Sequence, residues 1–185
     1  SNFNPKVGVE YQIDTDMMVY ASYAQGFKSG AFNPRATTNE PAADPETVDS
    51  VELGIKSEWF DQLRVNATVF ALEHTDRQYT TVIPNTDPTI LDQRLGNIGT
   101  SSAVGLELEV DYAATESLSF NLSLGYIDTE FDEVLTWDGT QFIDVSDRYT
   151  VANTPDITGN FSVTYDIETS IGSFVVNGNY YYRGD

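Results

Sequence analysis

The chain has 185 residues, enough for one domain, and its 29 acidic against 9 basic side chains give a net charge of −20. That charge excludes nucleic-acid binding, which needs a cationic face, and a content of 40% hydrophobic residues excludes a disordered acidic tail. The lack of cysteine excludes disulfides and thiol chemistry, and no apolar run is long enough for a transmembrane helix.

An alternation of apolar and polar residues runs through the chain and predicts β-strands with two unlike faces. It is clearest at 104–112, where Leu106 and Leu108 share one face while Glu107 and Glu109 share the other. In chain order the alternating runs are 5–13, 17–27, 51–59, 63–71, 104–112, 118–126, 157–165 and 174–182. The second run leaves open which of its two faces is the apolar one.

The connections between these runs are of two kinds, which alternate along the chain. The short ones are 14–16, 60–62, 113–117 and 168–172. The long polar ones run from about 28 to 47, 80 to 103 and 132 to 153. Alternation places all tight turns at one end of the strands, as in transmembrane barrels with short periplasmic turns and long extracellular loops. We therefore expect an all-β fold, a segment of about eight strands from an antiparallel up-and-down transmembrane β-barrel.

Aromatic residues gather near both ends of the predicted strands. Beside the short turns lie Tyr11, Trp59, Phe60, Tyr112, Tyr165 and Phe174. Toward the long connections lie Tyr23, Phe27, Phe70, Tyr79, Tyr126 and Phe131. Two such bands predict the interfacial girdles of a membrane barrel, although strands also favour aromatic residues in general.

Charged side chains stand in the middle of the predicted polar faces. They are Glu52, Lys56, Glu58, Glu107 and Glu109. Burying one charge alone costs several kcal/mol, so these groups need water or partners. Alternation by itself also fits a soluble β-sandwich, but a wide wet or plugged barrel interior supplies both water and partners.

Four stretches together resemble a known family: "YASYAQGFKSGAFNP" at 20–34, "PETVDSVELGIKSEWFDQLRVNATVF" at 45–70, "GLELEV" at 105–110 and "NTPDITGNFSVTY" at 153–165. In order and spacing they are similar to the C-terminal half of the barrel of TonB-dependent outer-membrane receptors. The resemblance implies a 22-stranded barrel, closed by an N-terminal plug, that imports a scarce nutrient such as a ferric siderophore. The plug would couple transport to TonB.

The resemblance covers essentially the whole chain, so we expect residues 1–185 to be a partial barrel domain, with the plug and the last strands absent. It implies a bacterial outer-membrane location and contact with outer-membrane lipid. Open strand edges are expected to promote self-association. Two other classes remain: a soluble acidic β-sandwich for binding or adhesion, including a calcium-dependent one, and an outer-membrane enzyme with a small barrel.

Two groups of residues are candidates for the functional site. Glu52, Lys56, Glu107 and Glu109 are expected to line the lumen and hydrogen-bond to the plug, or else to face open water. The exposed aromatic residues of the loop at 128–149 are expected to contact the ligand at the cell surface. These are Trp137, Phe142 and Tyr149.

No catalytic residue, cofactor or metal site is predicted. The glycine-rich "GFKSG" at 26–30 fails as a phosphate loop, because Phe27 separates Gly26 from Lys28. The sequence contains no G-x-S-x-G nucleophile motif that could act with the single histidine, His74. This side chain is therefore expected to be solvated or hydrogen-bonded. The acidic run from Asp128 lacks the glycine that an EF-hand loop requires.

Overall fold

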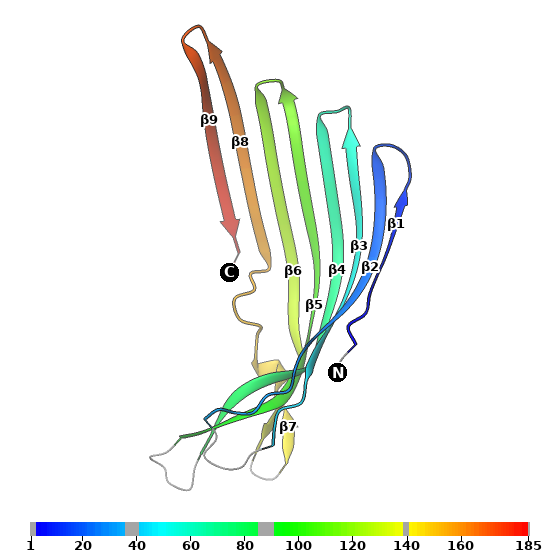
Figure 1. Ribbon diagram of the computed structural model, residues 1–185. Coiled ribbons are helices and arrows are strands. Elements are labelled where there is room, and N and C mark those ends of the chain that lie inside the picture. Colours follow the sequence, from blue (N-terminus) through cyan, green and yellow to red (C-terminus); the bar gives the residue numbers. More distant parts are fainter. Residues whose placement is uncertain (1–2, 36–40, 85–90, 139–140, 185) are drawn as a thin grey trace.

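The computed structural model describes residues 3–35, 41–84, 91–138 and 141–184, which form one antiparallel sheet (Figure 1). Its strands are β1 (Lys6–Gln12), β2 (Met17–Lys28), β3 (Glu46–Trp59), β4 (Leu63–Pro84), β5 (Leu91–Thr115), β6 (Leu118–Trp137), β7 (Phe142–Asp144), β8 (Ile157–Thr169) and β9 (Gly172–Arg183). A short 3₁₀ helix, η1, covers Ser146–Arg148. The sheet order is β1-β2-β3-β4-β5-β6-β8-β9, with β7 paired to β6. The all-β up-and-down fold is confirmed, and within the described ranges no helix could cross a membrane.

The short turns lie together at one end of the sheet and the long connections at the other (Figure 1). Two of the long connections contain more strand than predicted: in the stretch expected at 132–153, β6 continues to Trp137 and β7 covers Phe142–Asp144. The connection expected at 80–103 is largely strand, since β4 continues to Pro84 and β5 begins at Leu91. Beyond a membrane both faces of a hairpin are wet, so its sequence need not alternate and the strand is harder to recognise.

The register gathers the apolar side chains on one face of the sheet. Across one row, Leu53 pairs with Val69 and Val69 with Leu106. These three side chains remain 52%, 48% and 45% exposed, respectively. In the described part of the chain only Ala43 and Val145 are buried hydrophobic residues. Within the described ranges no second layer of structure covers this face, as a soluble sandwich would require, and the face suits contact with lipid.

The apolar face has the height of a membrane. In β4 it runs from Leu63 to Ala71 and then meets the exposed Glu73. Nine tilted strand residues span roughly 23 Å, close to the apolar band of about 25 Å on outer-membrane barrels. We call this part of the sheet the wall, and the parts of the strands beyond it the mouth.

Irregular pairing marks the boundary between wall and mouth in neighbouring strands. In β4, Thr75 and Asp76 stand against a single residue of β5, between Ser101 and Gly99. The backbone of Asp76 is left-handed, with φ 54°, as in a β-bulge. A further shift falls between β5 and β6 next to Ser101. Beyond these bulges the outer parts of β4 and β5 turn away from the direction of the wall (Figure 1).

The aromatic girdle was predicted correctly at one end and partly wrongly at the other. Near the short turns, Trp59 and Tyr112 lie on the apolar face, in register with Leu63. Toward the mouth, however, Phe70 pairs with Glu52 and so belongs to the polar face. The alternation in 63–71 already fixes the side of Phe70, because the apolar positions there are odd-numbered.

Phe131 and Tyr79 also do not belong to the predicted girdle, because both lie on the polar face. Phe131 pairs with Ser101 on the polar face. The ring of Tyr79 lies 6.3 Å from the ring of Phe131. In β4 the bulge inserts one residue before Tyr79, which exchanges the two faces of the strand and turns this ring inward.

Candidate functional site

The four predicted lumenal residues lie on one face, as expected from the alternation. Strand pairing places Glu52 opposite Phe70, and Lys56 opposite Asn66. On the other side of β4, Asn66 pairs with Glu109. Glu107 lies two residues from Glu109 on the same face of β5, and of the four only Glu52 is half-buried while the others are exposed. The structure thus brings the four together on one polar face.

The contacts of these residues leave their charged groups available to a further partner. Glu52 accepts a hydrogen bond of 3.3 Å from Ser22 Oγ, and Glu109 accepts one of 3.4 Å from Asn66 Nδ2. Both distances are long for hydrogen bonds to a carboxylate. Lys56 Nζ lies 5.6 Å from the centre of the Tyr20 ring. These predicted residues therefore make only weak contacts with their neighbours on the polar face.

Two aromatic rings lie flat against this face over glycines of the adjacent strand. A Cβ at Gly54 would come within 2.3 Å of the Tyr20 ring, and one at Gly105 within 2.2 Å of Phe70. Glycine is the residue that permits both contacts. The Tyr20 hydroxyl is 2.9 Å from Thr68 Oγ1. Two large side chains are thus held along the wall instead of projecting from it.

Near the short turns the polar face is hollowed, with a volume of about 430 Å³. Its lining includes an ion pair in which Arg64 donates to Glu58 at 2.8 Å, and a hydrogen bond of 2.6 Å from Asn121 to Asp111. Arg64 and Glu58 are both more than half exposed, so the pair contributes little to stability.

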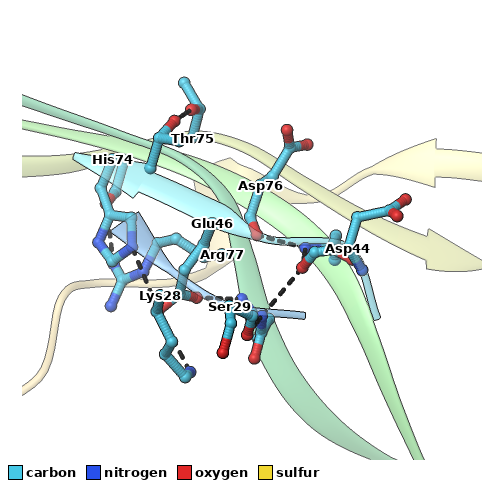
Figure 2. A network of polar contacts seen from close by, with 12 residues as sticks. Lys28, Ser29, Asp44, Glu46, His74, Thr75, Asp76 and Arg77 are labelled. Carbon is cyan, nitrogen blue, oxygen red and sulfur yellow. Dashed lines mark hydrogen bonds and ion pairs between the residues drawn. The ribbon is translucent and has the colours of Figure 1, made fainter. Parts of the chain in front are cut away.

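At the boundary between wall and mouth lies a cluster that sequence reasoning missed, shown in Figure 2. We call it the outer cluster and define it as Lys28, Glu46, His74 and Gln78. Glu46 is only 8% exposed. Its Oε1 lies 3.2 Å from Lys28 Nζ and 3.6 Å from His74 Nε2, and its Oε2 accepts a hydrogen bond of 2.6 Å from the backbone N–H of Gln78.

The outer cluster lies beyond the wall and shifts the pKa of two groups. Burial alone would raise the pKa of Glu46, but the Gln78 amide and Lys28 outweigh it and hold this pKa below its usual value. Burial, reinforced by the charge of Arg77, lowers the pKa of His74 despite the nearby Glu46. Near neutral pH the cluster therefore holds a charged carboxylate and a neutral imidazole.

The available sequence signal for this cluster was weak. Lys28 ends β2 and Glu46 begins β3, so antiparallel pairing of the two runs would have placed these charges opposite each other. The involvement of Gln78 depends on the bulge, which has no clear sequence mark. His74 is half-buried beside Glu46, where the sequence predicted only a solvated or hydrogen-bonded side chain.

The predicted ligand-contact loop is partly defined. The backbones of Trp137 and Phe142 pair across β6 and β7. Tyr149, just after η1, is 57% exposed. A role of the three in ligand contact stays a prediction. In the described residues of this loop and elsewhere, no three acidic or histidine side chains converge as they would around a metal ion.

Comparison with known proteins gives matches along the whole chain. The family model described as "TonB dependent receptor-like, beta-barrel" matches residues 1–185. The chain is 31% identical over 181 residues to the ferric-pyoverdine M114 receptor PbuA of Pseudomonas sp. strain M114, covering 95% of this chain and 21% of that protein. The chain therefore spans about a fifth of the length of this curated relative.

Solved structures share the fold. The ferripyoverdine receptor of the outer membrane of Pseudomonas aeruginosa, bound to ferripyoverdine, superposes with a TM-score of 0.70 at 20% identity, over 99% of this chain and 23% of that one. BauA, the ferric preacinetobactin receptor of Acinetobacter baumannii, gives a TM-score of 0.70 at 18% identity, over 97% of this chain and 25% of that one. Both matches show that this sheet shares its fold with part of these receptors.

Proposed function

Because the chain belongs to the TonB dependent receptor-like β-barrel family, we propose that the protein containing it imports a ferric siderophore across the bacterial outer membrane. The chain is an outer-membrane protein and supplies a set of adjacent strands to the barrel wall. The family consists of transport receptors, and we propose no enzymatic role for this chain and no bound cofactor.

The observation that carries this proposal is the 31% identity to a ferric-pyoverdine receptor across 95% of the chain. The geometry agrees with it. An exposed apolar face of membrane height requires lipid, and a charged polar face requires a wet or occupied interior. A soluble β-sandwich for binding or adhesion is disfavoured, because it would cover its apolar side chains with a second sheet.

Inside the barrel, we propose that the polar face meets an N-terminal plug domain supplied by the rest of the receptor. The support for this is the set of loosely engaged charges, Glu52, Lys56, Glu107 and Glu109. Through that plug the receptor would draw on TonB for energy. The proposed order of transport is ligand capture at the mouth, movement of the plug away from the polar face, and passage along it.

At the cell surface, we propose that Trp137, Phe142 and Tyr149 contribute to ligand capture. The support is the exposed ring of Tyr149 and the hairpin pairing that brings the other two backbones together. Flat aromatic surfaces suit the large planar groups of many chelates.

The import function is tested in a strain whose receptor gene has been deleted and replaced by the full-length gene. With ferric pyoverdine as the iron source, we expect growth and ⁵⁵Fe uptake that a protonophore abolishes. The deletion strain with an empty vector is the control. Uptake that is equal with and without the gene, for pyoverdine and for a panel of other ferric siderophores, would refute siderophore import.

A further inference from the structure

Glu46 is the first residue of β3 and lies against the outer hairpin, which is the part of β4 and β5 beyond the bulge. The last pair between β3 and β4 is Thr47 with Thr75. Beyond this pair, β4 has no β3 residue opposite it. The backbone N–H of Gln78 in that part of β4 donates to Glu46 Oε2 at 2.6 Å. The Glu46 carboxylate thus accepts the hydrogen bond that a backbone carbonyl of β3 would accept if β3 continued. The N–H that it binds lies beyond the bulge at Asp76.

A buried carboxylate destabilises a fold unless its oxygens are paired. Glu46, at 8% exposure, meets this condition with groups from two other strands. Lys28 at the end of β2 lies 3.2 Å from Oε1, His74 Nε2 of β4 lies 3.6 Å from the same oxygen, and the backbone N–H of Gln78 in the outer hairpin donates to Oε2. One side chain therefore links β2, β3 and β4 to the outer hairpin (Figure 2).

The same hairpin also holds the connection between β2 and β3, which the structure describes at 29–35 and 41–45. Gln78 Nε2 donates to the carbonyl oxygens of Ser29 at 3.0 Å and Asp44 at 2.9 Å. Asn97 Nδ2 donates to the carbonyl oxygens of Asp44 at 2.9 Å and Asp76 at 2.6 Å. Asn97 Oδ1 in turn accepts from the Asp44 amide at 2.7 Å.

The two ends of that connection are themselves tied together. Ala31 and Ala43 form a bridge with hydrogen bonds of 3.2 and 2.9 Å. A Cβ at Gly30 would lie 2.5 Å from the Ala43 oxygen, so glycine permits this approach. The connection and the outer hairpin therefore form one body, fastened at Gln78 and Asn97.

We propose that Glu46 is a positioning residue, which fixes the outer hairpin and the β2–β3 connection as a single body at a set angle to the wall. No catalytic or ligand contact is assigned to it. Its effect on ligand affinity, which rests on the proposed import function, comes from presenting the mouth in a pre-organised form.

The first test follows hydrogen–deuterium exchange in the full-length receptor by mass spectrometry. In Glu46→Ala we expect peptides covering 76–84 and 91–99 to exchange about tenfold faster, because the carboxylate that holds Gln78 is gone. Glu46→Gln keeps an acceptor but loses the charge, and we expect about a threefold increase. Gln78→Ala keeps the backbone N–H that donates to Glu46 but removes the side-chain hydrogen bonds to Ser29 and Asp44, so it should loosen the β2–β3 connection and raise exchange at 76–84 less than Glu46→Ala does.

Two controls separate positioning from general loss of stability. Peptides covering 63–71 in the wall should exchange at the wild-type rate in every variant, and the folded barrel should keep its resistance to SDS. Glu73→Gln makes the same substitution on an exposed carboxylate of the adjacent strand and should change nothing. Unchanged exchange at 76–84 in Glu46→Ala would overturn the proposal.

The second test measures binding of ferric pyoverdine to the same variants. We expect Glu46→Ala to weaken affinity by about fivefold to tenfold and Glu73→Gln to leave it unchanged. Faster exchange with unaltered affinity would overturn the role in presenting the mouth. If the wild-type receptor fails to bind this probe, the proposed ligand is wrong, while the exchange experiment alone still decides whether Glu46 holds the hairpin.

Discussion

At the scale of single residues, the most consequential side chains are those whose charge depends on their surroundings. The outer cluster places one imidazole and one carboxylate where burial and neighbouring cations act on both. His74 is kept neutral by burial and by Arg77, and Glu46 is kept charged by Gln78 and Lys28. Each pKa lies below its usual value, so the two groups make the cluster sensitive to acid in the same direction.

We predict that acidification from pH 7.5 to 5.5 loosens the outer hairpin. Below the usual histidine pKa of about 6.5, an opened cluster takes up a proton that the closed cluster rejects, so the closed form loses stability as pH falls. The chain has no cysteine, so a spin label placed through Thr80→Cys reports on the hairpin. We expect its mobile fraction to rise by about twofold, as a few tenths of a kcal/mol would give.

The same measurement in His74→Gln is the control. Glutamine does not titrate, so the mobility of the label should be flat across this pH range, and loss of the Glu46 charge should appear only at more acidic pH. An equal response in both proteins would assign the loosening to other groups.

At the scale of elements, β4 consists of two parts with different surroundings. From Leu63 to Ala71 it has one face in lipid and one in the lumen, and the alternation of its side chains is strict. Beyond the bulge it stands in water, where polar contacts to the β2–β3 connection replace the apolar face. The same strand thus has the strict alternation of a membrane strand in one part and the polar contacts of a water-exposed hairpin in the other.

We predict that Val69→Arg, on the lipid face at mid-wall, destabilises the full-length barrel by about 2–4 kcal/mol. A charge there must leave water for hydrocarbon. Asn66→Arg, on the polar face of the same strand, should cost less than about 1 kcal/mol, because the lumen side offers water and Glu109. Denaturant titration of the receptor refolded into lipid vesicles measures both values. Equal losses would mean that the two faces share one environment.

The wall could be predicted from the sequence because lipid on one side and water on the other force a strict alternation. The same alternation fixed the faces of Glu52 and Glu107, and applied to Phe70 it would have removed that residue from the girdle. The extent of β4 to Pro84 and the contact of Glu46 with Gln78 could not be predicted. Both lie beyond the bulge, where water surrounds the chain and pairing depends on distant partners.

The loop between β6 and β8 offers a separate test of ligand capture. Deleting residues 134–146 removes β7 and two of the three proposed contact residues, Trp137 and Phe142. We expect the affinity of the full-length receptor for ferric pyoverdine to fall by at least about tenfold, the loss typical of a major contact. Tyr149→Ala serves as the milder variant and should weaken binding less. Wild-type affinity after the deletion would rule out this loop as a contact surface.

At the scale of the whole molecule, the sheet has two features that call for partners. Its outermost strands, β1 and β9, form the two edges of the described sheet. Unpaired edges of this kind pair with further strands, either of the same barrel or of a second copy, so self-association of the isolated chain stays a prediction. The polar face is the second feature, since Glu52 and Glu109 accept only long hydrogen bonds from neighbouring strands of the described sheet.

We predict that replacing Glu107 and Glu109 by glutamine in the full-length receptor loosens the plug. Charge-assisted hydrogen bonds are roughly twice as strong as neutral ones, so two such losses should weaken plug retention measurably. Passive entry of a large antibiotic into cells should increase by about twofold or more, as a destabilisation of a few tenths of a kcal/mol implies. Glu73→Gln outside the barrel is the matched control. Unchanged entry would indicate that these carboxylates face only water.

The bulges between wall and mouth also bear on how such a protein can change over evolutionary time. A bulge absorbs a shift in register, so residues can be gained or lost beyond Thr75 and Asp76 while the pairing below them is preserved. Membrane insertion then makes no demand on the sequence of the surface-exposed part. A lineage can thus acquire a new ligand preference by remodelling the outer hairpin, with the lipid-embedded strands inherited unaltered.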